Sequence, residues 1–134
     1  MLTSINISNV FVLDQDEALK FYVDTLGLEV ASDIDLGFMR WLTVRVPGDV
    51  SREILLEKPA PPSMDEAAAN QVRELVTKGA TGFAVGFTTD DCRKTYEVLR
   101  ERGVEFTQEP TERPYGVEAL FRDSEGNWFS LGEK

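Results

Sequence analysis

The 134-residue chain contains no histidine and a single cysteine. Histidine is the side chain that most often moves protons near neutral pH, and it is a common ligand of transition metals, so sites built on it are excluded. One cysteine cannot form a disulfide within the chain. The first residues also lack the basic segment and the long apolar run of a signal peptide or a membrane-spanning helix. We therefore expect a cytoplasmic protein with no membrane partner.

Basic residues are few. The chain has 14 Lys and Arg against 24 Asp and Glu, which gives a formal net charge of −10 at pH 7. Such a charge repels a phosphate backbone, so nucleic-acid binding is not expected, whereas a cationic ligand would be attracted. The 42% of hydrophobic residues is ordinary for one globular unit with a buried core.

An internal repeat organises the chain. Residues 12–30 and 88–106 superimpose without a gap at an offset of 76, which places Asp14 on Asp90 and Gly27 on Gly103. Each copy predicts a strand, a helix and then three strands, as expected after gene duplication. We expect a first module at 1–59, a linker with an amphipathic helix at 60–80, and a second module at 81–134.

Local patterns predict the elements of the two modules. Helices are expected to start after the capping residue Asp14 and at Asp91, and to end at Gly27 and Gly103. A polar connection follows Gly27. The expected strands are 5–13, 38–46, 52–59, 82–89, 104–107, 117–122 and 127–131.

Two motifs carry a resemblance to a known family. The pattern V-x-D-x-x-x-A-x-x-F-Y-x-x-x-L-G is formed by Val12, Asp14, Ala18, Phe21, Tyr22, Leu26 and Gly27. The pattern D-x-x-G-N before the last strand is formed by Asp123, Gly126 and Asn127. With this element order the whole chain resembles the vicinal oxygen chelate superfamily, which includes glyoxalase I, extradiol dioxygenases and bleomycin-resistance proteins. The resemblance implies an α+β fold of two tandem βαβββ modules, with a curved mixed sheet around a cleft and helices outside.

The resemblance also implies where a metal would be held, at four inward positions on the strands. In this chain they are occupied by Ile7, Leu55, either Phe83 or Ala84, and Ser130. Neutral imidazole, thiolate or carboxylate donors are missing there, and a serine hydroxyl is a poor ligand for zinc, iron or nickel. We expect no metal and no other cofactor. The remaining route to a hard cation is Glu57 with a second inward carboxylate such as Glu118.

Strand alternation predicts which side chains face the cleft between the modules. They are largely apolar with a few polar groups, as in small-molecule pockets. The expected ligand-binding residues are Ile7, Asn9, Phe11, Trp41, Thr43, Leu55, Glu57, Tyr115, Arg122, Trp128 and Ser130. Trp41 and Trp128 could stack on a planar or cationic ligand, and packing in the core is the alternative interpretation.

Charged and reactive residues each have two interpretations. Arg122 could anchor a ligand carboxylate or phosphate, or it could neutralise nearby glutamates. Tyr115 could act as a lid or stand in a plain turn. Glu57 and Glu118 are the candidate general bases, or else solvated carboxylates. Cys92 has no histidine to activate it, so packing is expected instead of catalysis.

Besides a mainly regulatory or dimerising scaffold, which only the linker helix and the habit of pairing in the resembling family support, two functions remain open. One is metal-free binding of a hydrophobic or cationic small molecule, as in bleomycin-resistance proteins, which needs no catalytic residue. The other is a divergent enzyme of the lyase, isomerase or dioxygenase type that uses Glu57 or Glu118 for a metal or for acid–base chemistry. Whether any reaction is catalysed does not follow from these residues. The resemblance also leads us to expect a homodimer.

Overall fold

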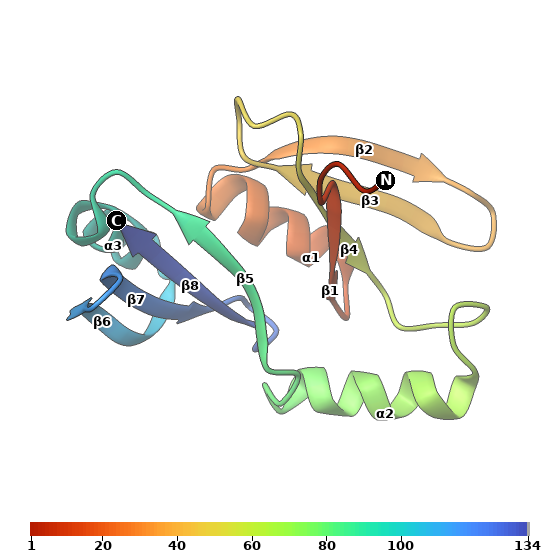
Figure 1. Cartoon of the computed structure of the whole chain (residues 1–134). Helices are drawn as coiled ribbons and strands as arrows, with labels where there is room; N and C mark the ends of the chain where they lie inside the picture. Colours follow the sequence, from red (N-terminus) through yellow and green to blue (C-terminus); the bar gives the residue numbers. More distant parts are fainter. Residues whose placement is uncertain (134) are drawn as a thin grey trace. The chain divides into compact units, whose positions relative to one another are not determined.

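The computed structural model describes residues 1–133, which form two compact units. The first unit is Met1–Glu74, and the second begins at Leu75. Figure 1 shows the elements of both units, and each unit is described by itself below. No helix of the described residues has the length and apolar character that crossing a bilayer requires.

The first unit is a four-stranded sheet with a helical segment on one face. Its elements are β1 (Ile7–Phe11), α1 (Gln15–Leu19), the π-helix η1 (Lys20–Thr25), β2 (Glu29–Asp35), β3 (Arg40–Arg45) and β4 (Glu53–Glu57). The strand order is β1-β4-β3-β2, with β1 parallel to β4 and the other pairs antiparallel. The side chains of Val10, Leu42 and Leu56 are buried on the helix side with Ala18 and Tyr22.

The second unit repeats this order. Helix α2 (Glu66–Thr77) runs across the boundary between the units and is followed by β5 (Phe83–Thr88), α3 (Cys92–Glu101), β6 (Glu105–Arg113), β7 (Gly116–Arg122) and β8 (Trp128–Glu133). The strand order is β5-β8-β7-β6, with β5 parallel to β8. In its core the rings of Phe121 and Phe129 stack at 5.2 Å between centroids. The expected two-module α+β fold is thereby confirmed.

The helices begin where the sequence predicts. The Asp14 carboxylate accepts from the backbone N–H of Glu17 at 3.0 Å, and the Asp91 carboxylate accepts from that of Lys94 at 3.0 Å. Each carboxylate satisfies a backbone donor that has no partner within its own helix. Gly27 and Gly103, at φ of 84° and 93°, follow the helices in a left-handed conformation that glycine adopts without steric cost.

The ungapped repeat at an offset of 76 is wrong within the first strand and helix. Ile7 pairs with Glu53 and Phe83 pairs with Trp128, so Ile7 corresponds to Phe83 at an offset of 76. Asn9 pairs with Leu55 and Gly86 pairs with Ser130, so Asn9 corresponds to Gly86 at an offset of 77. The offset changes from 76 to 77 because β5 contains a bulge between Phe83 and Val85.

The π-helix η1 restores the offset of 76 at the glycine. The caps are Asp14 and Asp91, which are 77 residues apart, so Asp14 corresponds to Asp91 and not to Asp90. The first helical segment therefore has one residue more than the second between cap and glycine. The wider turn of η1 accommodates this residue while Tyr22 stays fully buried.

Two strands differ from their predicted extent. The polar connection after Gly27 is in fact the strand β2, and β6 continues to Arg113 where only 104–107 was expected. Both strands form the outer edge of their sheets. Edge strands are exposed on several sides, so polar residues replace the apolar alternation that identifies a strand in a sequence.

Candidate functional site

The face of the first sheet that turns away from α1 carries seven of the predicted ligand-binding residues. Side chains alternate between the two faces along β1, β3 and β4; Val10, Leu42 and Leu56 are buried on the helix side, and the alternate positions lie on this open face. The open face holds Ile7, Asn9, Phe11, Trp41, Thr43, Leu55 and Glu57. Trp41 is half-buried and does not belong to the buried core, so it offers part of its ring surface for contact.

Polar groups on this open face are largely paired with each other. The hydroxyl of Thr43 donates to the Glu53 carboxylate at 2.6 Å, and the Arg45 Nε donates to the Glu29 carboxylate at 2.7 Å. Thr43 is completely buried, so its hydroxyl is committed to Glu53 and is a poor candidate for binding a ligand. What remains open here is mainly apolar and aromatic surface.

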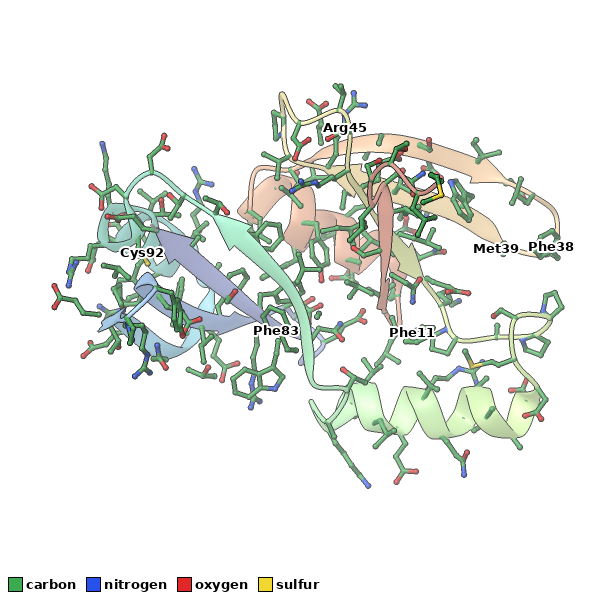
Figure 2. The ribbon with its side chains drawn as sticks, in the orientation of Figure 1. Phe11, Phe38, Met39, Arg45, Phe83 and Cys92 are labelled. Carbon is green, nitrogen blue, oxygen red and sulfur yellow. The ribbon has the colours of Figure 1, made fainter. Side chains whose placement is uncertain are left out.

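A hollow of about 310 Å³ lies at one end of the first sheet. Its lining includes Glu57 of β4 and, from the turn between β2 and β3, Phe38 and Met39, which Figure 2 labels. Phe38 is 63% exposed. Phe38 and Met39 are not among the expected ligand-binding residues; the expected strand 38–46 included them, whereas β3 begins at Arg40 and leaves both in the turn before it.

The open face of the second sheet collects the remaining predicted residues. Glu118 and Arg122 of β7 share a face with Trp128 and Ser130 of β8, because Arg122 pairs with Trp128 in the antiparallel register. The β5 bulge places Phe83 opposite Trp128, where its ring lies close to Gly86. Phe83 is 66% exposed; the sequence left Phe83 and Ala84 as alternatives for this position, because a single-residue bulge leaves no mark in the sequence.

Trp128 is held on two sides by its own unit. Its indole N–H donates to the carbonyl of Gly79 at 3.2 Å, and the guanidinium carbon of Arg122 lies 4.5 Å from the ring centroid. A cation over an indole face contributes about 0.5–2 kcal/mol. Among residues 1–133 no ion pair joins Arg122 to a glutamate, and its guanidinium lies over the Trp128 ring.

Tyr115 stands in the turn between β6 and β7 and is 65% exposed. Its hydroxyl donates to the Glu118 carboxylate at 3.0 Å, and the Arg113 Nε lies 3.9 Å from the same oxygen. The bond to Glu118 raises the pKa of Tyr115 above its ordinary value, because the anionic neighbour disfavours ionisation. A hollow of about 260 Å³ brings Tyr115 and Glu118 together with Ser130.

The comparisons with known proteins agree with this architecture. The model of the Glyoxalase/Bleomycin resistance protein/Dioxygenase superfamily matches residues 4–131. The chain belongs to this superfamily. The Bacillus subtilis (strain 168) protein YurT is 37% identical over 131 residues, which is 96% of this chain and 97% of YurT.

Two solved structures are similar to this chain over almost their whole length. The crystal structure of UcmS2 is 43% identical with a TM-score of 0.91, and 98% of each chain is covered. The crystal structure of TnmS3, an antibiotic binding protein from Streptomyces sp. CB03234, is 28% identical with a TM-score of 0.77 and covers 98% of this chain and 96% of TnmS3.

The metal positions implied by the superfamily resemblance do not fit a metal centre in this chain. The strand pairing identifies Phe83, and not Ala84, as the counterpart of Ile7, and Leu55 as the counterpart of Ser130. Three of these four side chains are hydrocarbons and the fourth is a neutral hydroxyl. Within residues 1–133 no three His, Cys, Asp or Glu side chains are grouped closely enough to hold a metal ion.

The two candidate bases and the thiol occupy different surroundings. Glu118 already accepts from Tyr115, and Glu57 borders the hollow of the first sheet. Cys92, labelled in Figure 2, is fully buried, and burial raises the pKa of its thiol. A buried neutral thiol is a weak nucleophile, so Cys92 belongs to the packing of α3.

Proposed function

We propose that this chain binds a largely apolar, ring-containing small molecule of the antibiotic type on the open faces of its sheets, without a metal ion. The observation that carries the proposal is the composition of these faces. Phe11, Trp41 and Leu55 in the first unit, and Phe83 and Trp128 in the second, leave ring and hydrocarbon surface uncovered. Such surface with a few polar groups is what apolar ligands select.

The superfamily relatives support this choice. TnmS3 is an antibiotic binding protein, and its fold matches this chain over nearly all its length. Binding that withholds a compound from its target needs no proton transfer and no Lewis acid. The proposal therefore agrees with a chain that has no histidine and no metal donors at the superfamily positions.

The net charge of −10 favours a cationic ligand during encounter. This long-range attraction is screened within about 8 Å at physiological salt, so contacts on the open faces decide affinity. Formation of a homodimer, the cytoplasmic location and the lack of nucleic-acid binding are part of the same proposal. Light scattering of the purified chain measures the first of them.

Tryptophan fluorescence tests the proposed function, because each unit holds one of the two tryptophans. The variants Trp41→Phe and Trp128→Phe each leave a single indole as reporter. Protein dialysed against EDTA is titrated with bleomycin and with a panel of polycyclic aromatic antibiotics. We expect a saturable change from at least one indole and recovery of the compound unaltered by mass spectrometry.

Substitutions on opposite sides of the units provide the control. Leu55→Asn changes the open face of the first sheet, whereas Val98→Ala changes an exposed position on α3. We expect the first variant to weaken binding about tenfold or more, and the second to leave it unchanged. Equal affinities of both variants would contradict binding on the open face of the first sheet. Chemical conversion of the compound would contradict a function of binding without catalysis.

A further inference from the structure

We propose that Arg122 and Trp128 form an anchor for a negatively charged group on the ligand, a carboxylate or an ionised phenol attached to an aromatic ring. This inference rests on the proposed function and specifies the chemistry of the ligand. It also reverses the expectation of a cationic compound, which depended on net charge alone.

Among the residues that the structure describes, the contact recorded for the guanidinium of Arg122 is with the Trp128 ring. Within the described part of the chain it forms no ion pair and no hydrogen bond, and its Nε is buried without an acceptor. An arginine side chain carries five N–H donors and stays charged at every pH at which proteins fold. In a chain with 24 acidic residues, a half-buried arginine without a carboxylate is available for an external anion.

The duplicated architecture provides an internal comparison. Arg45 and Glu29 are strand neighbours in the first sheet, and Arg122 and Glu105 are neighbours at the corresponding place in the second. The first pair forms an ion pair at 2.7 Å. Arg122 instead lies over Trp128, and among the described residues no ion pair joins it to the exposed Glu105.

The neighbour of Arg122 on β8 is an indole, at a position where the first unit has a carboxylate that accepts from Thr43. Counting from the strand pairs, Trp128 corresponds to Glu53 in the first unit, because Phe83 pairs with Trp128 as Ile7 pairs with Glu53. The second unit thus has an indole where the first has a carboxylate. One arginine is neutralised within its sheet, and the other is left positive beside an aromatic surface.

The position of the indole suits an aromatic anion. The bond from its N–H to the Gly79 carbonyl fixes the ring, and the guanidinium of Arg122 lies over the ring face with its carbon 4.5 Å from the ring centroid. A carboxylate can then accept two parallel N–H donors while the attached ring contacts apolar surface of the same face. The nearby carboxylate of Glu118 does not compete, because Tyr115 and Arg113 approach it.

The test compares three probes of one shape and different charge: naphthalene-2-carboxylate, naphthalene-2-carboxamide and 2-naphthylmethylammonium. Each is titrated to about 10 mM at fixed ionic strength into Trp41→Phe protein, and the indole N–H signal of Trp128 is followed by NMR, where millimolar dissociation constants are measurable. Arg122→Gln removes the proposed anchor. Arg45→Gln is the matched control, since it removes the paired arginine of the first sheet.

We expect the carboxylate to bind about tenfold or more tightly than the carboxamide, and Arg122→Gln to abolish this difference while Arg45→Gln preserves it. Arg122→Lys keeps the charge without the planar fork and should retain part of the preference. Circular dichroism tests whether each variant is folded. If Arg122→Gln does not fold, Arg122→Lys provides the decisive comparison.

Three results would overturn the anchor. They are equal binding of carboxylate and carboxamide, tightest binding of the ammonium probe, and no saturable shift with the carboxylate. Equal binding of naphthalene-2-carboxylate and naphthalene-2-carboxamide would contradict the anchor but not the proposed function. The proposed function is tested separately by the antibiotic panel, and it fails when the panel gives no saturable response or when a bound compound is chemically converted.

Discussion

The hydroxyl of Thr43 donates to the Glu53 carboxylate across 2.6 Å on the open face of the first sheet. Thr43 is completely buried and Glu53 is half-buried. The pair joins β3 to β4 beneath the surface that we assign to the ligand. A hydrogen bond from a buried hydroxyl to a carboxylate is stronger than one between neutral groups. The bond between Thr43 and Glu53 therefore fixes the spacing of β3 and β4.

Replacing Thr43 with valine preserves the shape of the side chain and removes the hydroxyl. The Glu53 carboxylate then loses its donor, and we expect the free energy of unfolding to fall by about 1–3 kcal/mol. Thr43→Ser keeps the hydroxyl and should lose clearly less. Urea unfolding measures both, and a Thr43→Val protein as stable as the parent would show that the bond has no net effect.

Gln15 is a second buried polar group that joins separate elements. Its side-chain amide donates to the carbonyls of Arg40 at 3.1 Å and Leu56 at 2.9 Å. Gln15→Met has a similar length and no donor, so two carbonyls lose their partner and stability should fall by about 2–3 kcal/mol. Gln71→Met on the exposed side of α2 is the control, with an expected change within about 0.5 kcal/mol. Equal unfolding midpoints for the two variants would contradict this role of Gln15.

The cap of the first helix should make stability depend on pH. The bond from the Glu17 N–H lowers the pKa of Asp14 below its ordinary value. A lowered pKa in the folded state means that the stabilisation is complete above the ordinary aspartate range and is lost as the pH falls through the folded value. Asp14→Asn retains an acceptor without a charge, so its urea midpoint should differ from that of the parent at pH 7 and approach it near pH 2. A constant difference across this range would contradict the assignment.

Cys92 should be unreactive in the folded chain. It is fully buried, its Sγ donates to the Leu131 carbonyl at 3.5 Å, and burial raises the pKa of its thiol. The thiolate that reacts with iodoacetamide is therefore scarce at pH 8. We expect complete labelling in urea and almost none in buffer over the same time, as measured by mass spectrometry. Rapid labelling of the native protein would place Cys92 in an accessible environment.

Much of this architecture can be predicted from the sequence. The caps Asp14 and Asp91, the glycines after the helices and the apolar alternation of β1, β3 and β4 each have a local physical cause, and the structure contains all of them. The faces of the predicted ligand-binding residues follow from the same alternation. The extents of the edge strands β2 and β6 were harder to predict from the sequence, because exposure permits polar residues on both faces of an edge strand.

Two single-residue features could not be predicted. The bulge after Phe83 and the extra residue of η1 lie in opposite copies of the repeat, so their shifts cancel and the ungapped match looks complete. The stacking of Arg122 on Trp128 is a choice of side-chain conformation between two possible neighbours, Glu105 and Trp128. A sequence pattern predicts which residues neighbour a side chain, but the packing of the folded chain determines which of them the side chain contacts.

The most direct test of the account is methyl NMR on protein dialysed against EDTA, titrated with the antibiotic that gives the largest fluorescence change. Ile7, Leu55 and Leu120 lie on the open faces, whereas Leu42, Leu56 and Leu131 lie in the cores. We predict saturable shifts that are largest for the three open-face residues, with no added metal. Shifts confined to the core leucines, or binding that appears only after a metal is supplied, would contradict metal-free binding on the open faces.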